Sequence, residues 1–168
     1  MYNDFNFGAY RGIIFTNDGN GGAKNGLALG LGLDKDCQGF CFEDGLEGAD
    51  FTFVNTQVVS TEAKVETEYV YAGADSDFTM TVFGGDFWGN PQHFIRMGDN
   101  SGRFILQNAR INHPARSTFV VMSGGSFNLS MATGGNMVKV ADLSKDAELT
   151  IRVCVATMTR SLQTAAGT

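Results

Sequence analysis

The chain has 168 residues, of which 43% are hydrophobic, and its net charge is −6 at pH 7. This length and composition predict one globular domain with a substantial core. Because the net charge is negative and the Lys and Arg residues are scattered, binding to nucleic acid or to an anionic membrane is unfavourable. We therefore expect neither as a partner, and no apolar run approaches the length of a membrane-spanning helix.

The first residues, from Met1 to Phe5, lack the basic region and apolar stretch of a secretory signal. Cys37, Cys41 and Cys154 are an odd number of cysteines, which fits a reducing compartment better than a disulfide framework. We expect synthesis and first folding in a cytoplasm, unless a leader was removed, and no disulfide that folding requires.

The 22 glycines and only 2 prolines, with many Val, Thr and Phe residues, favour short strands joined by tight turns. The composition therefore predicts an all-β domain with less than about a tenth helix. The first predicted strand covers residues Tyr10 to Thr16, which are β-branched and aromatic and are followed by a turn-forming run.

From Gly26 to Leu33 the sequence alternates strictly between leucine and a small residue. The glycines here would cost a helix about 1 kcal/mol each, so the alternation predicts a strand. Its small face consists of Gly26, Ala28, Gly30 and Gly32. A face without side chains admits another backbone closely, either at a bend within the domain or at a contact between subunits.

Residues Asp34 to Asp50 are rich in acids and turn formers, and we expect them to cross the surface. From Glu62 to Phe83 the sequence alternates on both sides of a turn-forming run, which predicts a long antiparallel hairpin. In its first arm, Glu62, Glu66 and Glu68 form an acidic stripe, which is either solvated or, in a ring, lines the lumen or faces a basic partner subunit. Val65, Tyr69, Tyr71, Val153 and Val155 are expected to be buried.

Further strands are predicted at residues 51–60, 94–97, 103–106, 118–122, 137–141 and 149–155, with a hairpin loop at residues 98–102. About ten strands at hairpin spacing, without a repeat of fixed period, indicate a sandwich or a barrel. The prediction is a single all-β domain over residues 1–168, built as an antiparallel β-sandwich or barrel, with a jelly roll as one possible topology.

No motif names a catalytic activity. The only histidines are His93 and His113, and Ser123 lacks the first glycine of a nucleophile elbow. Cys37 and Cys41 have metal-ligand spacing but no second ligand pair, while the Asn and Asp residues near positions 17–20 and 34–36 are ordinary turn formers. We therefore expect a protein that is not an enzyme and that has no cofactor and no metal.

One segment combines aromatic and polar side chains near a loop, which suits stacking on a sugar ring and hydrogen bonding to its hydroxyls. The residues are Phe87, Trp88, Gln92, His93 and Arg96. The alternative interpretation is that Phe87 and Trp88 anchor the core or an interface.

These observations favour a non-enzymatic structural protein that acts by self-assembly, such as a phage capsid-decoration or tail-tube subunit located in the virion after synthesis in the host cytoplasm. Its partners would be copies of itself, as a homo-oligomer, and other structural subunits. Assembly contacts are expected at the glycine face of residues 26–33 and at the terminal segment with Gln163 and Thr164, because that segment is too polar to bury much apolar surface by itself. The alternative is a β-sandwich carbohydrate-binding module that uses Trp88.

Overall fold

The computed structural model describes residues 2–17, 23–60, 67–112, 116–137, 139–144, 146–152 and 155–158. Every regular element in these ranges is a β-strand, which confirms the all-β prediction. Among the same residues there is no helix of the length and hydrophobicity needed to cross a membrane.

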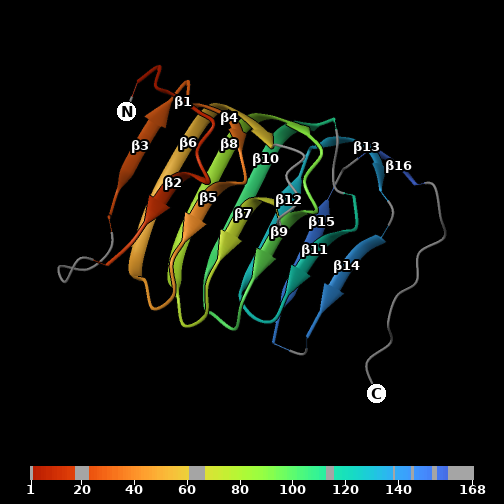
Figure 1. The fold of residues 1–168 in the computed structure, drawn as a ribbon. Helices are drawn as coiled ribbons and strands as arrows, with labels where there is room; N and C mark the ends of the chain where they lie inside the picture. Colours follow the sequence, from red (N-terminus) through yellow and green to blue (C-terminus); the bar gives the residue numbers. More distant parts are fainter. Residues whose placement is uncertain are drawn as a thin grey trace.

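The strands form two parallel sheets (Figure 1). The smaller sheet has the order β14 (Lys139–Leu143), β11 (Thr118–Met122), β9 (His93–Met97), β7 (Glu68–Ala72), β5 (Gln38–Phe42) and β2 (Arg11–Phe15). The larger sheet has the order β1 (Phe5–Phe7), β4 (Gly32–Asp36), β6 (Glu47–Ser60), β8 (Asp77–Gly89), β10 (Arg103–Ile111), β12 (Ser126–Ser130) and β15 (Glu148–Arg152). In addition, β3 (Gly26–Leu29) pairs with β6, β13 (Thr133–Met137) with β10, and β16 (Val155–Met158) with β13.

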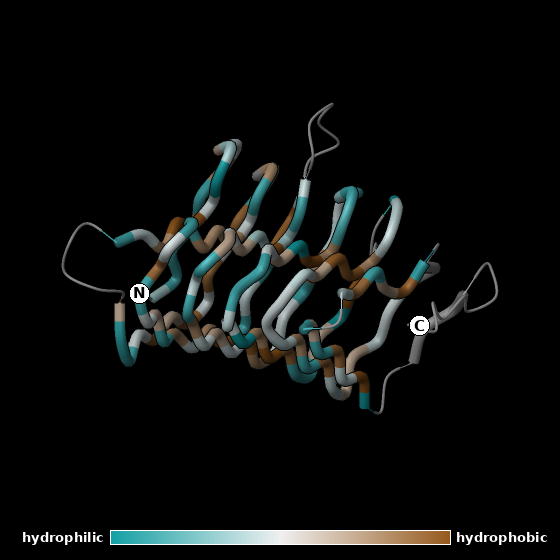
Figure 2. Tube along the Cα trace, turned by 90° about the horizontal axis from the view of Figure 1, so that it is seen from below, coloured by the Kyte–Doolittle hydropathy of each residue, from teal (hydrophilic) through white to brown (hydrophobic). Residues whose placement is uncertain are grey.

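The chain alternates between the two sheets, placing one short strand in the smaller sheet and then either one long strand or two short strands in the larger sheet before it starts the next turn. The result is a parallel β-solenoid of about five turns. In Figure 2 the turns lie side by side along one axis, and hydrophobic residues recur in each of them. The strands β1, β2 and β3 lie at one end of the solenoid, and β14, β15 and β16 at the other (Figure 1).

The core consists of inward-facing columns in which each turn contributes one side chain at the same register position. One column of the larger sheet contains Ala28, Phe53, Val82, Leu106 and Leu129, all of them buried. Aromatic rings join the two sheets across the interior, as in the stack of Phe42 on Phe78, whose ring centroids are 3.9 Å apart. Burial of apolar surface between the sheets is therefore the main stabilising term.

Six successive turns of the larger sheet each contain one residue with positive φ at the same register position, and we call this set the bend column. It contains Asn3 (φ 48), Gly30 (67), Asn55 (55), Gly84 (69), Asn108 (54) and Met131 (50). Glycine and asparagine tolerate this left-handed conformation best, and five of the six positions have one of them. A left-handed residue redirects an extended chain, so the long strands bend along one line.

The predicted antiparallel sandwich or barrel is wrong, because every pairing between described strands is parallel. The predicted hairpin from Glu62 to Phe83 is wrong for the same reason. Its arms correspond to β7 and β8, which lie in different sheets and pair with β5 and β9 and with β6 and β10. The loop at residues 98–102 likewise joins two sheets. A tight turn between two strands fits both a hairpin and a solenoid corner, and only the pairing partner distinguishes them.

Two surface predictions are also wrong. The segment from Asp34 to Asp50 contains β5, whose five residues are all buried, because this strand lies inside the stack between β2 and β7. Glu68 is not part of a solvated stripe, since its side chain is 0% exposed; Glu62 and Glu66 lie outside the described residues. Burial of Tyr69 is confirmed, and Tyr71 is half-buried.

The alternating segment from Gly26 to Leu33 is two strands, β3 and β4, rather than one. Gly30 lies between them in the left-handed conformation, so the odd-numbered residues face outward before it and inward after it. As a result Leu27 and Leu29 are exposed, whereas Leu31 and Leu33 are buried. The other predicted strands at residues 10–16, 51–60, 94–97 and 118–122 are confirmed as β2, the second part of β6, β9 and β11.

Candidate functional site

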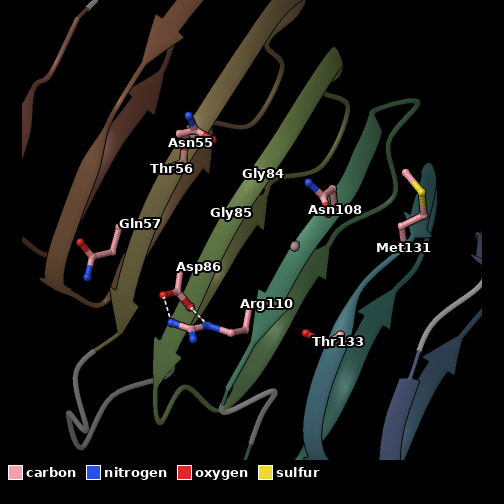
Figure 3. A pocket seen from close by; sticks show the side chains of 11 residues that line it. Asn55, Thr56, Gln57, Gly84, Gly85, Asp86, Asn108, Arg110, Met131 and Thr133 are labelled. Atoms are coloured by element: carbon pink, nitrogen blue, oxygen red, sulfur yellow. Dashed lines mark hydrogen bonds and ion pairs between the residues drawn. The ribbon is translucent and has the colours of Figure 1, made fainter.

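The outer surface of the larger sheet is hollowed along the bend column, and we call this feature the bend groove (Figure 3). It encloses about 540 Å³ and crosses β6, β8, β10 and β13. Its lining consists of Asn55, Thr56, Gln57, Gly84, Gly85, Asp86, Asn108, Ala109, Arg110, Met131 and Thr133. Because the groove crosses successive turns, it runs along the solenoid axis.

An ion pair of Asp86 and Arg110 lies across the middle of the groove (Figure 3). The Arg110 guanidinium donates two hydrogen bonds to the carboxylate, from Nε to Oδ1 at 3.1 Å and from Nη2 to Oδ2 at 2.6 Å. Asn112 Nδ2 donates a third to Asp86 Oδ1 at 3.0 Å. The hydrogen bonds that Arg110 donates to Asp86 raise the pKa of Arg110 above its ordinary value, so the guanidinium stays charged.

At the C-terminal end of the solenoid, two inward-facing columns finish on exposed apolar side chains. The first column contains Phe15, Phe42, Ala72, Met97 and Met122, all buried, and finishes on Leu143, which is 41% exposed. The second is the column of Phe53 and Leu129 described above, which finishes on Ile151, 43% exposed. We call Leu143 and Ile151 the C-terminal end face, because each occupies a core position that no described residue covers.

At the opposite end, the strands enclose an apolar hollow of about 250 Å³, which we call the N-terminal hollow. Its lining residues are Ile13, Ile14, Phe15, Thr16, Ala23, Phe51 and Phe53. Phe15 belongs to the same column as Leu143, and Phe53 to the same column as Ile151. Phe15 is thus the last residue of the Leu143 column at this end, whereas the Ile151 column ends one strand further on, at Ala28 of β3.

The outer face of the smaller sheet carries a polar network around buried Glu68. Gln38 Nε2 donates to Glu68 Oε2 at 3.2 Å, and Arg96 Nε lies 3.0 Å from Glu68 Oε1. Arg11 extends the network, since its Nε donates to Gln38 Oε1 at 3.2 Å. Arg96 also lies over the Tyr71 ring, 5.2 Å from its centroid. This network connects the four adjacent strands β2, β5, β7 and β9, and its contribution to their stability is a sufficient explanation of it.

The structure distributes the predicted sugar-binding residues over different surfaces. Phe87 is buried, with its ring 5.4 Å from that of Tyr69, whereas Trp88 is 43% exposed on the outer face. His93 Nδ1 donates to Thr118 O at 2.7 Å, and half-buried Gln92 precedes it. Arg96 belongs to the Glu68 network on the smaller sheet. Of these five residues, only Trp88 is exposed beside the bend groove, on β8 two positions after Asp86, whereas Phe87 lies in the core beneath it.

The small residues predicted as an assembly contact are covered by side chains of the same chain. A Cβ at Gly26 would meet Phe51, one at Gly30 would meet Asn3, and one at Gly32 would meet Phe5. Ala28 is 0% exposed. The close approach is thus made within the domain. This agrees with the first of the two interpretations of this face, a bend within the domain, rather than with a contact between subunits. Gln163 and Thr164 lie outside the described residues.

The cysteine and metal hypotheses have simple outcomes in the described part of the chain. Neither Cys37 nor Cys41 forms a disulfide bond there, while Cys154 lies outside it. No group of three or more His, Cys, Asp or Glu side chains is placed to hold a metal within the described ranges. Asp18 and Asn20, interpreted from the sequence as turn formers rather than metal ligands, are also outside them.

Sequence reasoning missed both the bend groove and the two end surfaces. The signal for the groove was the recurrence of Asn or Gly at Asn55, Gly84 and Asn108, which turn chemistry alone also explains. The signal for the C-terminal end face was absent, because Leu143 and Ile151 have the pattern of ordinary strand residues.

Comparison of the chain with protein-family models, with curated proteins and with solved structures gives no match. The functional interpretation is therefore built on the geometry of these surfaces.

Proposed function

We propose that the protein is a non-enzymatic structural subunit that self-assembles by stacking the C-terminal end of one solenoid on the N-terminal end of the next. The observation that carries the proposal is the C-terminal end face, where Leu143 and Ile151 are exposed at positions that are buried in every other turn of their columns. A stacked copy would bury them as the next turn does elsewhere.

The end strands support stacking through their backbones as well. In the described part of the chain, β14 pairs only with β11, β15 only with β12, and β2 only with β5. A strand paired on one side is a template for pairing with another chain. Parallel addition of β2 and β3 of a second copy would continue both sheets in their existing direction.

The core columns at the two ends match in register. Translation along the axis brings Leu143 toward Phe15 of the next copy and Ile151 toward Ala28, because these residues are the ends of the same two columns. Phe15 lines the N-terminal hollow, whereas Ala28 is buried in the single subunit. Such a contact joins two different surfaces, so it produces rings if its rotation closes and filaments if it does not.

The virion location expected from the sequence stays a prediction, because no described feature bears on it.

Light scattering coupled to size exclusion tests the proposal. The wild type should show a mass above the 18.0 kDa subunit that rises with concentration. Leu143→Glu and Ile151→Glu should each weaken association by roughly tenfold or more, because an apolar side chain gains about 1.5–3 kcal/mol on full burial and a charge there opposes it.

Phe83→Glu is the matched control, since Phe83 is exposed to a similar degree, 46%, but lies on the outer face of the larger sheet. It should assemble as the wild type does. A wild type that stays at 18.0 kDa at the highest concentration, or end-face variants that assemble unchanged, would overturn the proposal. Circular dichroism of each variant verifies that the subunit is folded.

A further inference from the structure

We propose that the bend groove binds a linear, uncharged, hydroxyl-rich polymer, that is, a segment of neutral polysaccharide. This inference is independent of the proposed self-assembly. The groove crosses β6, β8, β10 and β13, so a ligand along it would contact several turns in succession. Adjacent strands are about 4.8 Å apart, and polar groups repeated at that interval suit a ligand that is itself a repeat.

The polar side chains of the groove form a column with one member per turn. Gln57, Asp86 and Arg110 occupy the same register position on β6, β8 and β10, and Thr133 continues it on β13. Asn55 and Asn108 flank this column from the bend. Amide, carboxylate, guanidinium and hydroxyl groups together supply donors and acceptors, which is what a ligand with many hydroxyls requires.

The charges of the groove favour a neutral ligand. Asp86 and Arg110 neutralise each other through the ion pair of 2.6 Å, and the other polar lining groups are uncharged. An anionic polymer would meet the Asp86 carboxylate, and a cationic one would meet Arg110. Repulsion between like charges would therefore weaken the binding of an anionic polymer and of a cationic polymer.

Small residues and aromatic rings complete the surface. Gly84, Gly85 and Ala109 leave the base of the groove without long side chains, so a ring can approach the backbone. On β8, exposed Phe83 lies just before the bend at Gly84, and exposed Trp88 lies after it, two positions beyond Asp86. Each of the two parts of β8 therefore carries one exposed aromatic side chain. Aromatic faces stack on the apolar face of a sugar ring, while planar polar groups bond its hydroxyls.

The groove lies on the lateral surface, away from both ends of the solenoid. Head-to-tail stacking would leave it open, and binding does not require stacking. Light scattering and ligand titration on the same preparation therefore distinguish failure of this inference from failure of the proposed function.

The test is calorimetric titration with linear hexasaccharides of neutral glucans, mannans, galactans and chitin, beside oligogalacturonate and heparin oligosaccharides as acidic probes. Trp88 is the only tryptophan, so its fluorescence is a second readout near the groove. We expect saturable binding of at least one neutral oligosaccharide with little dependence on salt. Loss of one side-chain partner in Gln57→Ala should weaken it by roughly tenfold.

The double variant Asp86→Asn with Arg110→Gln should weaken binding of that oligosaccharide, because it removes both charges of the ion pair and the guanidinium donors. Thr81→Ala, on the outer face of β8 but outside the groove, is the control and should bind as the wild type does. Three outcomes would each overturn the inference: no neutral oligosaccharide binds at millimolar concentration, only the acidic probes bind, or the groove variants bind unchanged.

Discussion

Burial controls the chemistry of Cys41, which lies in the fully buried strand β5. Desolvation is the largest cause that raises the pKa of its thiol from 9.0 to about 11, and nearby Arg11 opposes the shift only in part. Because the thiolate is the reactive form, Cys41 should stay inert at neutral pH. In native protein at pH 8, iodoacetamide should modify half-buried Cys37 well before Cys41, as measured by peptide mass spectrometry. Equal labelling of the two thiols would contradict this.

The same pKa difference gives a pH dependence with a defined sign. Between pH 9.0 and about 11 the folded Cys41 keeps its proton while the unfolded thiol loses it, so the unfolded state binds fewer protons. The contribution of Cys41 to stability is therefore fully present below pH 9.0 and is lost as the pH rises toward 11. Cys41→Ala should flatten the alkaline decline in the urea midpoint.

The buried carboxylate of Glu68 should be the most sensitive polar site outside the groove. Glu68→Ala leaves Arg96 and Gln38 without the carboxylate they contact. Breaking a buried pair costs about 3–5 kcal/mol, and the lower end applies because Arg96 is 30% exposed. We expect the melting temperature to fall by roughly 6–12 °C. Glu148→Ala, at an exposed position, is the control, and an equal effect of the two variants would be inconsistent with the network.

At the scale of the strand, the bend column determines where each long strand changes direction. Gly84 has φ +69, and a Cβ there would lie 2.9 Å from Asn55 Oδ1. Gly84→Val should destabilise the fold by at least about 1–2 kcal/mol, the cost of a left-handed conformation for a side-chain-bearing residue. Gly84→Asn should cost less, because Asn55 and Asn108 adopt the same conformation in neighbouring turns. Urea denaturation of the two variants measures the difference, and equal midpoints would contradict the assignment.

Individual strands were predictable from the sequence, whereas their pairing was not. The alternation of Phe78, Met80 and Val82 with Thr79 and Thr81 describes one half-buried strand, and the structure confirms it in β8. That alternation has the same period in parallel and antiparallel sheets. The bend residues then reverse the parity within β8, so that Phe83 and Asp86 both face outward. A left-handed residue inside a strand cannot be distinguished from a turn by composition.

For the whole molecule, the repeat could not be detected in the sequence, because the turns repeat in their structure but not in residue identity or in length. Asn55, Gly84, Asn108 and Met131 are equivalent in position but not in identity, and the loops between turns differ in length. The groove residues were missed for the same reason, since Gln57, Asp86 and Arg110 come together only when three turns stack. Trp88 was identified because a single tryptophan is conspicuous without any knowledge of the fold.

A solenoid in which each turn contacts only its neighbours should unfold from its ends. The strands β6, β8 and β10 are paired on both sides, whereas β2, β14 and β15 are paired on one side in the described residues. Hydrogen exchange measured by mass spectrometry on dilute protein should therefore be slowest in the three central strands and fastest in the three end strands.

Raising the protein concentration then separates the ends from the interior. If copies stack end to end, β2, β14 and β15 gain backbone partners, and their exchange should slow with concentration while that of β8 stays unchanged. In Ile151→Glu the concentration dependence should shift to protein concentrations roughly tenfold higher or more. The exchange of β8 should match the wild type, because Ile151 is 43% exposed in the single subunit. Protection that rises equally in all strands would point to general stabilisation rather than to contact at the ends. End-strand exchange that is independent of concentration in the wild type would argue against stacking.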